Sequence, residues 1–253
     1  MGLVELPGNR LAQAQVPDLP PAYWEAVNDA RVAEPNEIYP NLTAITDHNH
    51  RLRRDDRDRV LVVTWSGWNG YSQNAGSLLV LTRELWVTVA PDLQQFCRAY
   101  HPTATISLAA RLNQLLGLPP DSGNRQVIEL WVDPQYLFRP SPDPEISDRE
   151  AELAFRTANP FVTSSPDYQH WFYTQYDQRY QHNGQPVTPI SFDGINIPYP
   201  WTQLGYTYDW GSAADWQEVS PGRPDHIGLS EFVVQAWSPI SVHSAQSAEA
   251  YCQ

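Results

Sequence analysis

The C-terminal part of the chain contains three segments that decide the fold: Pro200-Trp-Thr-Gln-Leu-Gly-Tyr-Thr-Tyr-Asp-Trp-Gly211, Gly228-Leu-Ser-Glu-Phe-Val-Val234 and Ser238-Pro-Ile-Ser-Val-His243. Their aromatic and β-branched residues predict short strands. Side chains alternate along a strand, so Glu231 is expected on the face opposite Phe232 and Val234. A single carboxylate at the start of a hydrophobic strand, close to a glycine, predicts a side chain that reaches into a cleft.

Upstream of these segments, strands and helices are mixed. Apolar runs predict strands at 60–65, 78–81, 84–89 and 127–132, and three- and four-residue spacing predicts helices at 92–100, 106–116 and 168–180. Asn69-Gly70 predicts a turn, and Ser147-Asp-Arg-Glu150 matches a capping box at a helix start. Regular β-α-β alternation is absent. The predicted class is therefore α+β, with a mixed helix-and-strand N-terminal half packed on a twisted, β-rich C-terminal half.

The length of 253 residues is enough to bury a substantial core. Residues 1–22 mix proline, glutamine and leucine without a period, and they predict an extended tail. Residues 23–253 are then expected to form a single compact domain, in which 124–253 would be the catalytic half.

Charge and hydropathy exclude several classes of protein. The net charge is −13, which disfavours non-specific attraction to nucleic acid or to anionic lipid. The mean hydropathy is −0.48, and no run approaches the ~18 apolar residues of a membrane-spanning helix. All 16 lysine-or-arginine positions are arginine. That composition fits either a toxin or effector chain that avoids lysine modification in a eukaryotic cytosol, or the codon usage of a GC-rich genome.

Cys97 and Cys252 are the only cysteines, too few and too widely spaced for a zinc site. They predict either one disulfide between an early helix and the C-terminus, which would imply an oxidising compartment, or two buried free thiols. The triplet Ala12-Gln-Ala14 resembles a signal cleavage site, but residues 1–11 contain no basic region followed by an apolar stretch. We expect either a start that lies upstream or an ordinary polar tail. We therefore expect a secreted or periplasmic location, with the cytoplasm as the alternative.

Three features of this region together resemble the last two strands of the ADP-ribosyltransferase fold. They are a glycine-rich segment, an acid followed by an aromatic residue and two valines, and a short Ile-x-Val strand after a proline. They are also similar to the C-terminus of NAD glycohydrolases of the tuberculosis-necrotizing-toxin type. The similar stretch is 201–243. The resemblance implies an NAD-cleaving enzyme, either a glycohydrolase or an ADP-ribosyltransferase. Leu229 stands where a second acid would serve transfer to arginine, which favours NAD hydrolysis.

The resemblance also implies a set of site residues. Glu231 would stabilise the positive charge that develops on the ribose, and Arg139 would hold the pyrophosphate with its planar fork. Thr202 would supply the hydroxyl of the nicotinamide pocket. The remaining ligand-binding candidates are Tyr206, Tyr208, Trp210 and Gly228. No cofactor is expected beyond NAD as the substrate, no metal is expected, and any protein partner is left open.

Each of these residues also has a structural alternative. Glu231 could be a solvent-facing strand residue, Arg139 could form a salt bridge to Asp143 or Glu145, and aromatic residues in a period-two stripe are commonly core. The NAD interpretation therefore carries a geometric condition, which is that Arg139 and Glu231 line one cavity.

An alternative function is an aromatic-rich secreted binding module or a hydrolase for glycans. The aromatic residues would then be sugar platforms, and hydrolysis would need paired carboxylates ~5 to 9.5 Å apart. Several residues are candidates for these two roles: Trp65, Trp68, Tyr71, Trp201, Trp210, Trp216 and Trp237 as platforms, and Asp209, Asp215 and Glu218 as acids. The motif Asp47-His-Asn-His50 offers two imidazoles to a metal, but a charged, solvated turn is the favoured interpretation.

Overall fold

A computed structural model describes residues 19–100, 106–120, 123, 125–155, 165–182, 184–189, 197–212 and 226–253. Its helices are α1 (Pro21–Asp29), η1 (Pro35–Glu37), α2 (Gly70–Gln73), α3 (Ala90–Ala99), α4 (Leu108–Leu115), η2 (Pro134–Tyr136), α5 (Pro166–Tyr180) and α7 (Ala248–Tyr251). Its strands are β1 (Val60–Ser66), β2 (Leu78–Val80), β3 (Leu85–Val89), β4 (Gln126–Val132), β5 (Leu137–Phe138), β6 (Gln181–His182), β7 (Gln185–Pro186), β8 (Tyr206–Tyr208), β9 (Ile227–Ser230), β10 (Phe232–Val234) and β11 (Pro239–Gln246). The predicted α+β class is confirmed.

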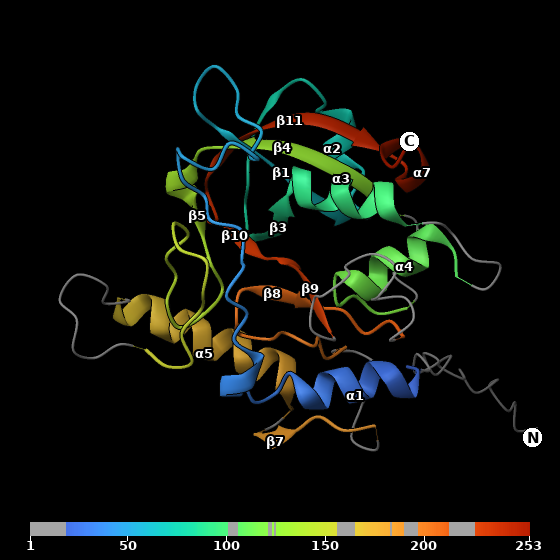
Figure 1. Ribbon diagram of the computed structural model, residues 1–253, viewed down its shortest axis with the longest axis vertical. Coiled ribbons are helices and arrows are strands. Elements are labelled where there is room, and N and C mark those ends of the chain that lie inside the picture. Colours follow the sequence, from blue (N-terminus) through green and yellow to red (C-terminus); the bar gives the residue numbers. More distant parts are fainter. Residues whose placement is uncertain are drawn as a thin grey trace, which may run out of the picture.

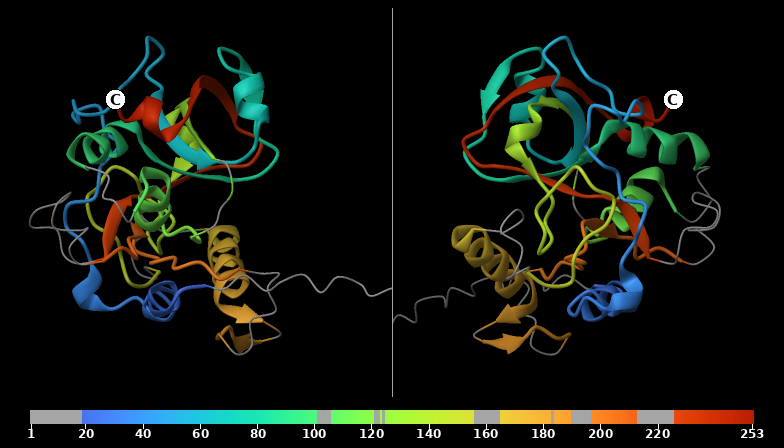
Figure 2. Two further views of the ribbon diagram at one scale, coloured as in Figure 1. Left: turned by 90° about the vertical axis from the view of Figure 1, so that its right-hand side faces the viewer. Right: turned by 60° about the vertical axis from the view of Figure 1, so that its left-hand side comes forward.

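A curved antiparallel sheet in the order β2-β11-β4-β1-β3-β10-β5 forms the upper part of the molecule in Figure 1. The order is non-sequential because β11 and β10, which come late in the chain, pair with β4 and β3. Helices α3 and α4 lie on one side of the sheet, while α1 and α5 lie at the end remote from β11 (Figures 1 and 2). The pair β8–β9 lies between these two ends and leads into β10.

Two faces of the sheet bury separate apolar cores. Val62, Val89, Leu130 and Phe232 belong to the first core, on one face. Val63 and Trp65 of β1 point the other way and pack with α3, α4 and α7. This alternation within one strand is the period-two geometry expected of β1. A third core joins α1 and α5 to Trp201 and Trp210.

Local sequence explains where several helices begin and end. Pro91 occupies the first turn of α3, as predicted, and the Ser107 and Ser165 side chains accept hydrogen bonds from the backbones of Ala110 and Tyr168. Gly117 has φ +66 just beyond α4, a conformation that a glycine adopts without strain. The strands predicted at 60–65, 84–89 and 127–132 are confirmed within a residue at each end.

The turn predicted at Asn69-Gly70 is present at Asn69 and leads into the short helix α2. Three other sequence predictions need correction. Helix α1 begins at Pro21, inside the stretch 1–22 predicted as tail. No helix follows Ser147, because the backbone at 146–149 is bent and the carboxylate of Asp148 is bound to Arg139. The stretch 230–234 is not one strand: β9 ends at Ser230 and β10 begins at Phe232.

Cys97 and Cys252 form a disulfide that joins α3 to the residue after α7 across 155 positions of sequence. The disulfide alternative is therefore the one that the structure contains. Within the described residues, no helix combines the length and the apolar character needed to cross a membrane.

Candidate functional site

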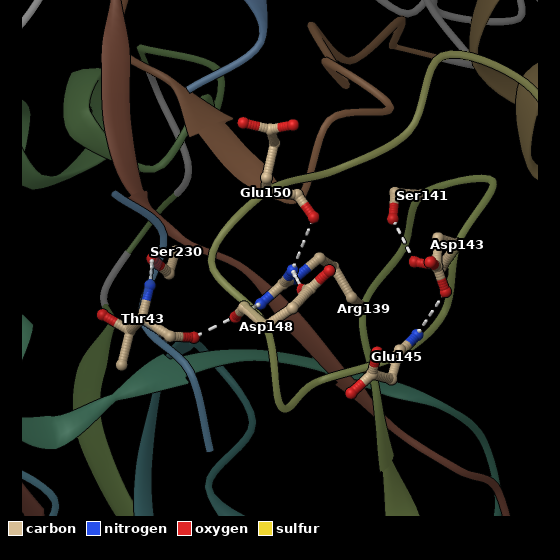
Figure 3. Close-up of polar contacts among 8 residues, drawn as sticks. All are labelled: Thr43, Arg139, Ser141, Asp143, Glu145, Asp148, Glu150 and Ser230. Atoms are coloured by element: carbon tan, nitrogen blue, oxygen red, sulfur yellow. Dashed lines mark hydrogen bonds and ion pairs between the residues drawn. The ribbon is translucent and has the colours of Figure 1, made fainter. Parts of the chain in front are cut away.

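The Arg139 side chain lies in the interior and belongs to a structural network (Figure 3). Its terminal nitrogens contact the Asp148 carboxylate and donate to the backbone oxygens of Asp148 (3.0 Å), Glu150 (3.2 Å) and Thr43 (3.4 Å). The guanidinium also lies 5.9 Å from the ring centre of Phe232. Arg139 thus ties the β5 end to the loop at 148–150 and to Thr43. Its salt-bridge partner is Asp148, not either of the two acids proposed from sequence.

Gly205 is required by this network. It has φ +73, and a β-carbon there would come within 2.5 Å of the Arg139 side chain. The backbone oxygen of Gly205 accepts a hydrogen bond of 2.9 Å from the Glu231 backbone nitrogen. The turn at Gly205 therefore contacts the Arg139 side chain and the Glu231 backbone. It does not bring the two side chains together.

A cavity of about 420 Å³ lies on the other side of β10. Its wall comes from β1, β3, the turn after α4, the segment 199–201, the last turn of α5 and Glu231. The polar and aromatic members of this lining are Thr64, Trp65, Ser66, Arg83, Glu84, Trp86, Thr88, Arg125, Arg179, Tyr199, Trp201, Thr207, Tyr208 and Glu231. Arg139 is not among them, so the structure does not bring Arg139 and Glu231 to one cavity.

Glu231 lies at the junction where the chain leaves the β8–β9 pair and enters the large sheet. Val87 pairs with Phe232, and continuing this register by one residue places Thr88 opposite Glu231. Glu231 is half-buried and lines the cavity. Burial raises the pKa of Glu231 to about 8, and the charge of Arg179 opposes this rise. In the free protein Glu231 is therefore mostly a neutral carboxylic acid at pH 7.

Arg179 is the cation that faces Glu231. It lies in the last turn of α5, with its guanidinium 4.6 Å from the ring centre of Trp86 and 5.4 Å from that of Trp201. One nitrogen donates to the Gln175 backbone oxygen at 3.1 Å. Burial lowers the pKa of Arg179, and Glu231 is the largest of the charges that oppose it. The same Arg179 nitrogen also donates to Gln175 Oε1 at 2.5 Å, and no carboxylate of the described residues forms a salt bridge with Arg179.

The predicted pocket residues have mainly structural contacts. Thr202 Oγ1 donates to the Tyr206 backbone oxygen at 2.7 Å and accepts from the Leu204 backbone nitrogen. The Tyr206 hydroxyl donates to Glu37 O at 2.9 Å, and Trp210 Nε1 donates to a backbone oxygen at 2.9 Å. These contacts hold the β8 region against η1 and the turn after α4. Thr202, Tyr206 and Trp210 are not part of the cavity lining.

Tyr208 and Gly228 complete the predicted set. Tyr208 does line the cavity, while its hydroxyl donates to Asp29 at 2.8 Å and its ring stacks on His226. Gly228 is explained by packing, because a β-carbon there would lie 2.2 Å from Thr207 Oγ1. Of the seven predicted site residues, Glu231 and Tyr208 are thus the two that reach the cavity.

Residues of the alternative interpretation fall in several places. Trp65 and Trp201 line the cavity, whereas Asp209 is buried in a bidentate pair with Arg111 at 2.6 and 2.9 Å. Asp215, Trp216 and Glu218 lie outside the described residues. Glu84 is a second carboxylate in the cavity lining, and its sequence context gave no signal for that role.

Two groups of described residues have the donor atoms for a metal ion: Asp29, Glu37 and His226, and Asp143, Glu145 and Asp148. The second group surrounds Arg139, whose guanidinium contacts Asp148 (Figure 3). The histidines of Asp47-His-Asn-His50 belong to neither group and are exposed.

Sequence reasoning missed Arg179, Trp86 and Thr88. Trp86 and Thr88 alternate with core residues along β3. The sequence pattern therefore predicts that their side chains share one face of the strand, but it does not predict which elements pack on that face. Arg179 is one charge in a mostly polar helix, and tertiary packing alone brings it to Glu231.

Comparisons with known proteins add no relative. No protein-family model matches the chain, and no curated protein or solved structure shows significant similarity to it.

Proposed function

We propose that this chain is an enzyme that cleaves the N-glycosidic bond of a nucleotide, with NAD as the leading substrate and hydrolysis as the leading reaction. The observation that carries the proposal is a cavity lined by Glu231 and by Arg179, whose guanidinium lies over the faces of Trp86 and Trp201. Apolar cavities with a few convergent charged groups and a perturbed carboxyl are typical of active sites. The expected anchor Arg139 is replaced in this proposal by Arg179.

Arg179 suits the pyrophosphate for the reasons that first pointed to Arg139. A planar guanidinium grips two phosphate oxygens at once, and stacking on two indole rings fixes its orientation. Arg83 and Arg125 also line the cavity and add positive potential in a chain whose net charge is −13. A local group of arginines of this kind lets an acidic protein bind an anionic ligand.

Glu231 would act as a carboxylate once the substrate is bound. The nicotinamide ring of NAD is a cation, and a positive charge beside a carboxyl lowers its pKa, so binding would release the Glu231 proton to solvent. The C1′–N bond then breaks with its electron pair moving to the ring nitrogen. Glu231 stabilises the positive ribose, and water adds at C1′ with loss of one proton. The products are nicotinamide and ADP-ribose.

The direct test is to incubate purified protein with NAD and to follow nicotinamide by chromatography. Preorganised charge stabilisation contributes on the order of 3 to 4 kcal/mol, so Glu231→Gln should lower kcat roughly a hundredfold or more. Glu84→Gln is the matched control, because it removes a carboxylate from the same cavity and should cost less than tenfold. Equal activity of wild type and Glu231→Gln would remove that residue from the mechanism, and no turnover of NAD or other nucleotides would overturn the class.

A glycan hydrolase is the second candidate, because Glu84 and Glu231 line the same cavity. Leu85 pairs with Val234, so Glu84 is four residues along β3 from the position opposite Glu231, or about 13 Å between α-carbons. That spacing is wide for a carboxylate pair that flanks one glycosidic bond. Loss of oligosaccharide turnover in both single Glu→Gln variants would favour this candidate. Oligosaccharide binding without turnover would favour a binding module.

A further inference from the structure

Three side chains with metal-binding atoms meet where the ends of α1 and η1 approach the start of β9. Asp29 is the last residue of α1, Glu37 is the last residue of η1, and His226 directly precedes β9. One ligand atom of each lies within 4.8 Å of the other two. None of the three belongs to the lining of the cavity that contains Glu231. Segments distant in sequence therefore bring two carboxylates and an imidazole to a second place on the molecule.

The fold orients both carboxylates and leaves one oxygen of each without a donor. Asp29 Oδ2 accepts a hydrogen bond of 2.8 Å from the Tyr208 hydroxyl, and Glu37 Oε2 accepts one of 2.6 Å from the Glu34 backbone nitrogen. Among the described residues, no side chain forms an ion pair with either carboxylate. Two neighbouring carboxylates without a cation repel each other, and a divalent ion between them would remove this repulsion.

The acidic group at 143–148 shows the contrast. It also has three carboxylates close together, but the Arg139 guanidinium contacts Asp148 and supplies positive charge there. The corner at Asp29 and Glu37 has no such arginine in the part of the chain that the structure describes. It has an imidazole instead, and an imidazole nitrogen is a ligand for transition metals.

The imidazole is held in place by the same tyrosine that orients Asp29. The His226 ring stacks on Tyr208 with 4.9 Å between ring centres and 16° between the planes. The His226 backbone oxygen accepts a hydrogen bond of 2.8 Å from the Asp209 backbone nitrogen, which fixes the start of β9. Tyr208 thus supports two of the three side chains, one by its hydroxyl and one by its ring. Such support fixes the orientation of ligand side chains at metal sites.

We propose that Asp29, Glu37 and His226 bind one divalent transition-metal ion, with zinc as the leading candidate. Zinc binds carboxylate oxygen and imidazole nitrogen at about 2.0 to 2.2 Å, and water can complete a set of three protein ligands. Two such bonds span at most ~4.2 Å. Ligand atoms within 4.8 Å of one another therefore close on an ion through small side-chain movements. Asp29 is exposed and the other two residues are half-buried, so an ion reaches them from solvent.

The proposal goes beyond NAD cleavage and does not depend on it. The ion would join the end of α1 to η1 and to the start of β9, and it would stabilise the folded state without taking part in bond cleavage. Calcium and magnesium prefer oxygen ligands, so the imidazole favours zinc over both.

The experiment titrates Zn²⁺ into the full chain, free of affinity tags and of bound metal, by isothermal titration calorimetry at about pH 7. One Zn²⁺ should bind per chain, more tightly than Mg²⁺. Asp29→Asn and His226→Asn should each weaken binding roughly a hundredfold or more, because each removes one of three ligands. Asparagine suits position 226 because it tolerates the left-handed backbone there, where φ is +61. Tyr208→Phe keeps the ring, loses the hydroxyl and should weaken binding roughly tenfold.

Glu34→Gln is the matched control. It removes a negative charge from the same loop but keeps the side-chain oxygen that accepts from the Glu37 backbone, and it should change the Kd less than about threefold. His50→Asn tests the exposed motif 47–50 and should leave Zn²⁺ binding unchanged. Zn²⁺ should also raise the Tm of wild type and of Glu34→Gln but not that of His226→Asn.

No binding of Zn²⁺ by wild type, or equal affinity of wild type and His226→Asn, would overturn the proposal. So would a loss in Glu34→Gln as large as that in Asp29→Asn, because it would show general attraction to an acidic surface. NAD cleavage by metal-free protein would in those cases leave the proposed function intact. Zn²⁺ binding with the expected variant pattern but no cleavage of any nucleotide would contradict the proposed function alone.

Discussion

Arg139 and Arg179 both lie against the β10 region, yet on opposite sides of it. Arg139 packs over Phe232 and its terminal nitrogens contact Asp148 and three backbone oxygens. Arg179 lies on the side of Glu231, stacks on two indole rings and forms no salt bridge with a described carboxylate. The same residue type thus has an acid partner in one region and, among the described residues, no salt-bridge partner in the other.

The comparison separates a structural arginine from the arginine that we propose as the ligand-binding one. Complete burial with an acid and several carbonyl partners indicates a residue that holds loops together. Partial burial in a cavity wall, with aromatic support and no acid partner, indicates a residue that is preorganised for an anion. Order along the sequence cannot make this distinction, because both arginines neighbour aromatic residues in the chain.

The largest expected effect is a loss of stability when Arg139 is replaced. Arg139→Met should lower the free energy of unfolding by about 3 to 5 kcal/mol, because it leaves the Thr43, Asp148 and Glu150 carbonyls without their donor. Urea denaturation at pH 7 measures this loss. Arg51→Met is the matched control, since that side chain is 68% exposed and its 3.6 Å ion pair should be worth less than about 1 kcal/mol.

Equal losses in these two variants would contradict the structural role of Arg139. Arg139→Lys sharpens the test, because lysine keeps the charge but cannot reproduce the planar fork. Its unfolding free energy should fall closer to that of the methionine variant than to wild type.

The main elements of the fold could be predicted because their patterns are local. Apolar runs such as 60–65 and helix signals such as Pro91 with Gly117 depend on neighbours in the chain, and each was found where it was expected. The capping box at Ser147 failed for a tertiary reason: Asp148 binds Arg139, and the bent backbone there starts no helix.

The candidate site could be predicted only in part. Glu231 carries a local signal, an acid at the start of an apolar strand, and it does line the cavity. Its neighbours Arg179 and Thr88 come from a helix and a strand that are distant in sequence, so only the folded arrangement identifies them. The aromatic residues Tyr206 and Trp210 showed the period-two pattern of a strand face, and they are core or near-core residues.

A smaller change in the free energy of unfolding, of opposite sign, is expected when Glu231 in the cavity lining is replaced. The folded pKa of Glu231, about 8, lies above the ordinary value of 4.5, so the folded state binds the proton more tightly than the unfolded state. The stability that this provides is fully present below pH 4.5 and is lost as the pH rises to about 8. Glu231→Gln removes the cost of burying an ionised carboxylate, so it should stabilise the protein at pH 9 by roughly 1 to 3 kcal/mol. This figure allows for the partial exposure of Glu231, which lowers the cost.

Urea denaturation of both proteins at pH 4.5, 7 and 9 measures this change, and the stability difference between them should grow with pH. A difference that is independent of pH, or one that shrinks as the pH rises, would show that burial does not raise the pKa of the carboxyl. A destabilised glutamine variant at every pH would place Glu231 in the same structural category as Arg139.

The smallest effect on stability, and the sharpest comparison, comes from Arg179→Gln. Losing two cation–π contacts while relieving the burial of a charge should change the unfolding free energy by about 1 kcal/mol or less. Arg179 opposes the rise in the Glu231 pKa, so the variant should titrate Glu231 above the value of about 8, as followed by carbon-13 NMR of its carboxyl. Arg139→Lys, measured on its folded fraction, should leave that titration unchanged, because Arg139 faces the other side of β10. A Glu231 pKa that moves in the Arg139 variant and stays fixed in the Arg179 variant would reverse the assignment of the two arginines.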